Sequence, residues 1–320
     1  MAEQQTPEHV VVVGAGMVGL ATAWFLQAEG VRVTVVDREG VAAGSSWGNA
    51  GWLAPALTMP LPDPSILAMG VKAALSPSSP VYVPFTTNPQ LLTFLASFAL
   101  HCTPNRWRAA MAVFTEANHG ALAAFDALAA GGVDEPTREA DPLLAAFLSE
   151  HDRDGLVHEF EHVAEVGGPT EHELVDGDAM RVLEPALSEA VTHGVLLRGQ
   201  RFINPGRFVH ALAHAVRERG GTILDGVEVD AVERVRDRVE VRPVTGDTID
   251  ADAVVIASGT WLGRLAGRTA SGRSSRPAAA TAFSCRLGRS RPTRCTSRRS
   301  AWRARRSTGP TARPVCASPG

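Results

Sequence analysis

Three apolar segments near the N-terminus predict a strand, a helix and a second strand. His9–Val13 is a short β-branched run typical of a buried strand. Residues 17–29 carry apolar side chains at helical spacing, and Gly30 is expected to end the helix. Residues 31–36 are again β-branched, and the run closes at Asp37. A strand, glycine turn, helix and strand within about thirty residues are typical of the βαβ unit.

The same kinds of pattern return in the last third of the chain. Asn204 as the N-cap and Pro205 in the first turn predict the start of a helix, which Gly220 and Gly221 should end. Strand-like runs follow at 222–224, 227–232, 239–244 and 253–257. The middle of the chain differs from both ends: residues 57–89 are rich in proline, 91–101 and 107–128 predict amphipathic helices, and 138–200 predict short mixed elements.

These elements predict an α/β protein, α+β as a whole, with a helix-rich middle part. Residues 267–320 form an aberrant tail of Arg, Ala, Ser and Pro that we expect to be disordered.

Composition supports a globular body but separates it sharply from the tail. The apolar fraction is 45% and the net charge is −3, yet no acidic residue follows Asp252, whereas residues 265–320 carry thirteen arginines. Cys102 is the only cysteine before the tail, so we expect no disulfide framework and a reducing compartment. The uncharged run 10–28 could pass for a membrane span, but its glycines and preceding valines favour a strand and turn. A cytoplasmic protein without a signal peptide is expected.

The glycine spacing Gly14-x-Gly16-x-x-Gly19 has a chemical interpretation. The first glycine permits a tight turn, the second leaves room for a pyrophosphate, and the third lets the helix approach the sheet. The helix N-terminus then offers free N–H groups to the phosphates. Asp37, at the end of the second strand, is placed to accept hydrogen bonds from an adenosine ribose and disfavours a 2′-phosphate. The pattern predicts an adenine dinucleotide, without separating FAD from NAD.

Two further segments carry a resemblance to a known family. These are Gly-Ser-Ser-Trp-Gly-Asn-Ala-Gly at 44–51 and Ala-Asp-Ala-Val-Val-Ile-Ala-Ser-Gly-Thr-Trp at 251–261. Together with the N-terminus, they resemble the FAD-dependent D-amino-acid oxidase superfamily, and most closely the bacterial D-amino-acid dehydrogenases. The resemblance covers residues 9–266. It implies a discontinuous Rossmann-type FAD-binding domain formed by residues 1–56 and 201–266, and an inserted helix-rich substrate or cap domain, residues 57–200, that covers the flavin and shapes the substrate pocket.

The resemblance also implies which residues bind FAD. They would be Val13, Gly14, Gly16, Met17, Val18, Gly19, Asp37, Arg38, Ser45, Ser46, Asn49, Ala50, Gly51, Val229, Ala257, Ser258 and Gly259. Val229 would lie on the strand whose backbone meets the adenine, although an ordinary strand valine is nearly as good an interpretation. No metal is implied.

The implied reaction is the oxidative deamination of D-amino acids to 2-oxo acids and ammonia, a step of amino-acid catabolism. The implied partners are a small amino-acid substrate and a quinone or respiratory electron acceptor, but no nucleic acid. Peripheral association with the inner face of the cell membrane stays open. Alternatives are a glycine- or sarcosine-type FAD oxidase and a catalytically dead nucleotide-binding product; an NAD enzyme would leave 44–51 and 253–259 unexplained.

Other chemical signals are weaker. His158-Glu159-Phe160-Glu161-His162 matches the zinc-peptidase motif H-E-x-x-H, but the extended motif fails, His172 is the only nearby third ligand, and an exposed charged helix is preferred. Arg201 or Arg207 could hold a substrate carboxylate, but each is better explained as a surface arginine. Tyr82 and Cys102 are expected to pack rather than react. No catalytic residue is assigned.

The tail suggests a reading-frame shift. Arg, Ala, Gly and Pro have GC-rich codons, and with a suitable choice of third bases a shifted reading of 276–283 can give Ala-Gly-Arg-Gly-Tyr-Ser-Phe, which looks like a flavoprotein strand. We therefore expect a truncated enzyme that lacks its carboxylate-binding arginine and tyrosine and binds FAD weakly or not at all. A basic nucleic-acid-binding tail is the alternative interpretation. Genomic DNA with an intact frame across codons 266–272 would contradict the frameshift.

Overall fold

A computed structural model of the chain describes residues 6–64 and 88–266, which divide into two compact units. The first unit contains residues 6–55, 117–140 and 200–266, and the second contains 56–64, 88–116 and 141–199. The tail, with its expected disorder, and Tyr82 lie outside the described residues.

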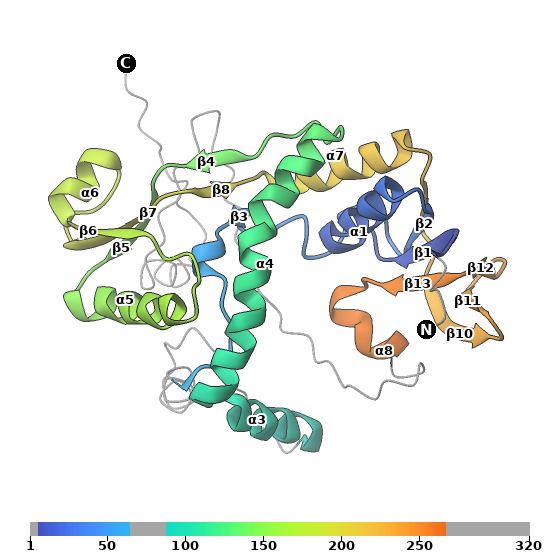
Figure 1. The fold of residues 1–320 in the computed structure, drawn as a ribbon, viewed down its shortest axis with the longest axis horizontal. Helices are drawn as coiled ribbons and strands as arrows, with labels where there is room; N and C mark the ends of the chain where they lie inside the picture. The colour runs from blue at the N-terminus through green and yellow to red at the C-terminus, as the bar shows by residue number, and fades with distance from the viewer. Residues whose placement is uncertain (1–5, 65–87, 267–320) are drawn as a thin grey trace, which may run out of the picture. The chain divides into compact units, whose positions relative to one another are not determined.

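A four-stranded parallel sheet forms the centre of the first unit (Figure 1). Its order is β13-β1-β2-β9, so β1 lies between β2, the next strand along the chain, and β13, the last strand of the described residues. The strands are β1 (His9–Val13), β2 (Arg32–Asp37), β9 (Thr222–Asp225) and β13 (Ala253–Ile256). Helix α1 (Met17–Ala28) makes the crossover from β1 to β2. The predicted βαβ unit and the α/β fold with a parallel sheet are confirmed.

The two faces of the parallel sheet are covered by different layers. Val10 and Val12 belong to a buried cluster with Leu20 of α1, whereas Val11 and Val13 belong to a second cluster with Val241. Alternate side chains of β1 thus fill two separate cores, which explains its unbroken run of valines. The helical layer is α1 and α7 (Pro205–Glu218), and the opposite layer is the antiparallel sheet β10 (Val229–Val235), β11 (Arg238–Pro243) and β12 (Ile249–Ala251).

Helix α7 starts as its sequence predicts. The side-chain oxygen of Asn204 accepts a hydrogen bond from the Arg207 amide at 3.1 Å, and Pro205 occupies the first turn. Phe208 and Leu212 are fully buried on the face that packs toward the sheet. Gly220, with a φ of +83°, ends the helix and directs the chain into β9.

Residues 117–140 pack with the first unit, although the sequence placed them in the inserted domain. They include the C-terminal half of α4 (Pro104–Ala130), where Leu128 belongs to the same buried cluster as Trp24 of α1. Gly131 lies so close to Trp24 that a Cβ would stand 2.1 Å from its ring. Nearby, β3 (Trp52–Leu53), β8 (Gln200–Phe202) and β4 (Arg138–Ala140) form a small antiparallel sheet.

The second unit is a three-stranded antiparallel sheet with helices. Its strands are β5 (Leu143–Phe147), β7 (His193–Leu197) and β6 (His172–Asp176), in the order β5-β7-β6. Its helices are α3 (Pro89–His101), the first half of α4, α5 (Glu150–Glu165) and α6 (Gly177–Leu183), and Pro55–Leu57 forms a 3₁₀ turn at the junction of the two units. Across the described ranges, no helix is both long and apolar enough to span a bilayer.

Candidate functional site

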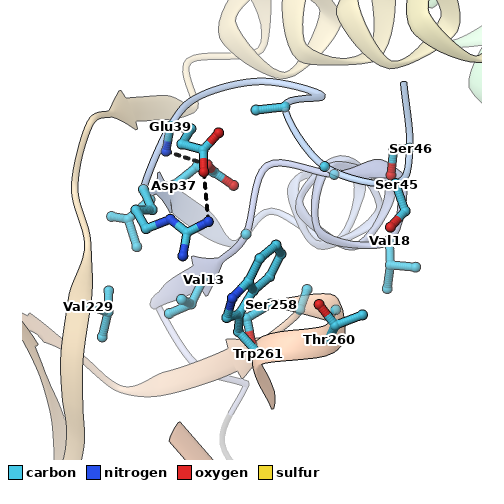
Figure 2. Close-up of a pocket in the computed structure, with 18 of the residues that line it drawn as sticks. Val13, Val18, Asp37, Glu39, Ser45, Ser46, Val229, Ser258, Thr260 and Trp261 are labelled. Atoms are coloured by element: carbon cyan, nitrogen blue, oxygen red, sulfur yellow. Dashed lines mark hydrogen bonds and ion pairs between the residues drawn. The ribbon is translucent and has the colours of Figure 1, made fainter. Parts of the chain in front are cut away.

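A half-open pocket of about 220 Å³ lies at the carboxyl ends of β1, β2 and β13, entirely within the first unit (Figure 2). The carboxyl edge of a parallel sheet is where such folds bind ligands. Val229 lies toward one end of the pocket and Ser45 and Ser46 toward the other, with Trp261 between them. The lining residues are Val13, Gly14, Gly16, Met17, Val18, Val36, Asp37, Arg38, Glu39, Ala43, Gly44, Ser45, Ser46, Val227, Glu228, Val229, Ala257, Ser258, Gly259, Thr260, Trp261 and Leu265.

The glycine turn after β1 forms the floor of the pocket. Gly14 has a φ of +117°, and a Cβ there would stand 2.5 Å from the carbonyl oxygen of Ala257. Its amide donates to the carbonyl of Val36 at 2.8 Å. Behind the turn, a Cβ on Gly19 would stand 1.9 Å from the carbonyl oxygen of Gly14. Glycine at these two positions therefore lets α1 and β13 close tightly around the turn.

Ser46 covers the N-terminal end of α1. Its hydroxyl oxygen accepts a hydrogen bond from the Met17 amide at 2.9 Å, and a Cβ on Gly16 would stand 2.9 Å from the same oxygen. The hydroxyl proton of Ser46 is left to donate elsewhere. The positive end of the helix dipole and this hydroxyl, with Ser45 beside it, suit an anionic group such as a phosphate.

Asp37 organises the turn through its carboxylate. One oxygen accepts from the Ala15 amide at 2.8 Å, and the other accepts from the amides of Glu39 and Gly40, both at 2.9 Å. A carboxylate offers about four acceptor positions, so roughly one is left for a ligand hydroxyl. Asp37, which is predicted to bind a ribose, thus also holds the end of β2 against the glycine turn through hydrogen bonds.

Arg38 and Trp261 meet inside the pocket. The guanidinium carbon of Arg38 lies 4.5 Å from the centre of the Trp261 ring, a cation–π distance. The same guanidinium forms an ion pair with Glu39 at 2.6 Å. These contacts join the end of β2 to the turn Gly259–Trp261 that follows β13.

Ser258 contributes an unsatisfied polar atom. Its hydroxyl oxygen is buried and has no hydrogen-bond partner in the part of the chain that the structure describes. The residue lies beside Gly14, because a Cβ there would be 3.3 Å from the Ser258 amide nitrogen. Buried hydroxyls are normally paired, so this one suits a pocket whose ligand supplies the partner.

Most of the predicted cofactor residues line this pocket, and four do not. Gly19 packs behind the turn, and Ala50 lies outside the lining. Asn49 holds the loop together: its amide nitrogen donates to the Ser46 carbonyl and its oxygen accepts from Gly51. A Cβ on Gly51 would stand 2.3 Å from the Ile203 carbonyl oxygen, so this glycine lets the loop pass close to the segment before α7.

Several lining residues were not predicted from the sequence. They are Val36, Glu39, Ala43, Gly44, Val227, Glu228, Thr260, Trp261 and Leu265. Most of them adjoin residues that were identified, so extending each motif by one or two positions would have found them. The contact of Arg38 with Trp261 had no such signal, because it joins positions more than two hundred residues apart.

The other candidates lie elsewhere. Arg201 is ion-paired with Asp126, and neither it nor Arg207 lines the pocket. His158 lies on the exposed side of α5, paired with Glu161 at 3.1 Å, and within the described ranges no group of three or more His, Cys, Asp or Glu side chains could hold a metal ion. Cys102 is buried, and this burial raises the pKa of its thiol.

Comparison with known proteins gives a consistent result. A family model described as FAD dependent oxidoreductase, DAO, matches residues 9–306. This match extends into the tail, so the frameshift stays a prediction. D-amino acid dehydrogenases from Phenylobacterium zucineum and Chromohalobacter salexigens are each 28% identical over 259 residues, 79% of this chain and 60% and 61% of theirs. The chain thus spans about 60% of the length of these relatives.

Solved structures share the fold. Glycine oxidase from Geobacillus kaustophilus aligns with a TM-score of 0.55 at 21% identity, over 82% of this chain and 58% of that one. An L-α-glycerophosphate oxidase from Mycoplasma pneumoniae, solved with FAD bound, aligns with a TM-score of 0.53 at 17% identity, over 83% and 57%. The chain belongs to the FAD-dependent oxidoreductase family DAO, which confirms the resemblance and the prediction of FAD as the cofactor of the family.

Proposed function

We propose that the pocket of the first unit holds FAD. The N-terminus of α1, Ser45 and Ser46 would face the pyrophosphate, the remaining acceptor position of Asp37 would take a ribose hydroxyl, and Val229 would border the adenine. The residues present fit this group, because the glycine floor carries no side chains and the buried Ser258 hydroxyl awaits a partner. When bound, FAD supplies the hydride acceptor, while the protein supplies binding and orientation.

The activity we propose is oxidative deamination of D-amino acids to 2-oxo acids and ammonia. Its main support is the pocket at the carboxyl ends of β1, β2 and β13, in a chain whose relatives include D-amino acid dehydrogenases. The reacting carbon would lose its hydride to the cofactor, and the resulting imine would be hydrolysed. None of the described residues is assigned a catalytic role, so the chemistry that this chain itself contributes is the positioning of FAD.

The cofactor assignment is tested by the absorbance spectrum of the purified chain after incubation with FAD and gel filtration. We expect a bound flavin spectrum in wild type, in place of the weak or absent binding expected from the frameshift, because all lining residues of the pocket lie in the described first unit. A chain that stays colourless at saturating FAD, although its circular dichroism shows it folded, would contradict the assignment and favour the dead product.

The substrate class is tested with the loaded protein. D-alanine, L-alanine, glycine and sarcosine are offered in turn, with an artificial dye or with oxygen as the acceptor, and flavin bleaching is followed. We expect bleaching by the D-amino acid and reoxidation by the dye. Bleaching by glycine or sarcosine with rapid oxygen consumption would instead show a glycine- or sarcosine-type oxidase.

A quinone or respiratory carrier is our proposed acceptor, and peripheral membrane association would accompany it. Helix α3 supports this, because it has no acidic or basic side chain before His101 and exposes Leu92, Phe94 and Leu100. Sedimentation with zwitterionic phosphatidylcholine vesicles should carry the protein down, and Leu92→Ser with Leu100→Ser should leave it in the supernatant. Equal recovery of both proteins in the supernatant would contradict the association.

A further inference from the structure

The charges that line the pocket point to a selectivity beyond FAD binding itself. Arg38 is the only cationic side chain among the described lining residues, and three acidic ones accompany it: Asp37, Glu39 and Glu228. The pocket wall is therefore net negative at the end where β2 stops. An anion placed there would meet repulsion rather than a counter-charge.

Arg38 has the position that usually decides whether such a site accepts a 2′-phosphate on the ribose. In dinucleotide-binding folds, the acid at the end of the second strand takes the ribose hydroxyls, and a nearby arginine accommodates a 2′-phosphate. Arg38 directly follows Asp37, so by position alone the site could accept a phosphorylated ribose. A planar guanidinium is well suited to a phosphate.

The structure shows this guanidinium already engaged. Glu39 holds it at 2.6 Å, and the Trp261 ring lies beneath it at 4.5 Å. Glu39 lies beside Asp37 (Figure 2), whose carboxylate accepts a hydrogen bond from the Glu39 amide at 2.9 Å. The carboxylate offsets the one positive charge among the described lining residues, and the Trp261 ring packs against the guanidinium.

We propose that Glu39 is a specificity-determining residue that makes the pocket select unphosphorylated adenosine and reject adenosine carrying a 2′-phosphate. The ligand class is an adenosine diphosphate moiety with a free ribose, as in FAD, and the excluded class is its 2′-phosphorylated counterpart. The inference rests on the proposed cofactor site. Glu39 and Arg38 would together exclude the 2′-phosphate, a role that would otherwise belong to Asp37 alone.

The test compares 5′-ADP with 2′-phospho-ADP, which differs from it only by the phosphate on the 2′-oxygen, by isothermal titration at low ionic strength, where screening of half-exposed charges is weakest. Wild type should bind 5′-ADP and bind 2′-phospho-ADP much more weakly. Glu39→Gln should strengthen binding of 2′-phospho-ADP relative to 5′-ADP about fivefold or more, the order expected for removal of one charge near a partly exposed site. The readout is the ratio of the two affinities, because Glu39 lines the pocket and any effect of the substitution common to both nucleotides cancels in this ratio.

Two further variants identify the cause. Arg38→Gln combined with Glu39→Gln should lose the gain, because the released guanidinium is what would hold the phosphate. Glu233→Gln is the matched control: Glu233 is paired with Arg242 at 3.0 Å at similar exposure, outside the pocket lining, and its removal should leave both affinities unchanged.

The outcomes distinguish a wrong role for Glu39 from a wrong cofactor site. If wild type binds the two nucleotides equally, or Glu39→Gln shifts both affinities alike, the role of Glu39 is wrong although the cofactor site stands. If a folded wild type binds neither nucleotide and no FAD, the cofactor site is wrong and the selectivity with it.

Discussion

At the scale of single residues, the pocket depends on positions where a side chain would be in the way. Gly14 combines a left-handed φ with an approach to the Ala257 carbonyl that leaves no space for a methyl group. Gly44 lines the same pocket but has open space around its Cβ position and an ordinary φ. The two glycines differ in what they do, although both belong to motifs found in the sequence.

Gly14→Ala should therefore destabilise the protein by about 1–3 kcal/mol, through strain and displacement of β13, and abolish flavin binding. Urea unfolding and the flavin spectrum measure both effects. Gly44→Ala is the control and should stay within about 0.5 kcal/mol of wild type. Equal stability of the two variants would show that the turn is not held as tightly as its geometry indicates.

Ser258→Ala should separate ligand binding from folding. Its hydroxyl has no partner in the described part of the chain, so removing it should leave the unfolding free energy of the cofactor-free protein unchanged or raise it. FAD affinity should fall by roughly 3- to 10-fold, the equivalent of one hydrogen bond worth about 1 kcal/mol. The measurements are thermal unfolding without cofactor and flavin titration; unchanged affinity would mean that the hydroxyl does not face the ligand.

At the scale of secondary-structure elements, His9 ties together the amino-terminal edge of the parallel sheet. Its ring nitrogens lie 3.1 Å from the Asp250 carbonyl and 2.9 Å from the Thr34 hydroxyl, and its amide donates to Asp252 at 2.9 Å. Burial, followed by the charge of Arg32, lowers the pKa of His9. The strands β1, β2 and β13 therefore start beside a histidine that favours its neutral form.

This predicts a loss of stability on acidification. Because the pKa of His9 is lower in the folded state, the unfolded chain takes up a proton first, so stability declines as pH falls below the ordinary histidine value of 6.5. The Asp252 carboxyl behaves differently: the His9 amide holds its pKa below 3.8, so its contribution persists to lower pH. Urea midpoints between pH 7.5 and about 5 should fall less in His9→Gln than in wild type.

His210→Gln, which replaces an exposed histidine on α7, is the control and should retain the wild-type pH dependence. If His9→Gln shows the same slope as wild type, the acid sensitivity arises at another group.

Elements with a strong local pattern could be predicted from the sequence, and elements defined by distant partners could not. The bounds of β1 and the start of α7 match the prediction, because the valine run and the Asn204-Pro205 cap are local signals. Strands β3, β4 and β8 have only two or three residues each and exist through pairing alone. The glycine turn and Asp37 were identified for the same local reason, whereas the Arg38–Trp261 contact depends on the tertiary fold.

At the scale of the molecule, the first unit is assembled from three separate stretches of chain. The end of α4 supplies Leu128, 3% exposed, to the cluster that also contains Trp24 and Phe208. The Arg219 guanidinium lies 4.0 Å from the centre of the Trp24 ring and donates a hydrogen bond to the Gly131 carbonyl at 3.2 Å. Residues 117–140 are thus part of the structure that supports the pocket, although nothing in their sequence connects them with a dinucleotide.

Leu128→Ala should consequently destabilise the first unit by about 2–5 kcal/mol, the usual cost of truncating a buried leucine. We expect flavin release and unfolding of the first unit to occur together at a lower urea concentration than in wild type. Leu100→Ala, at a position 70% exposed on α3, should change stability by less than about 0.5 kcal/mol. Flavin retention by Leu128→Ala at the wild-type urea midpoint would show that 117–140 is not needed by the cofactor unit.

The place of β13 beside β1 also sets the order of events during synthesis. The glycine turn leaves the ribosome early, but the strand end that closes over it, with Ser258 and Trp261, is made about 240 residues later, which at roughly 5–20 residues per second is a delay on the order of 10–50 s. Until then, β1 has an open edge where β13 will pair. Cofactor capture is therefore a late step in the life of the nascent chain, and the valine-rich β1 must be protected from other partners for that whole interval.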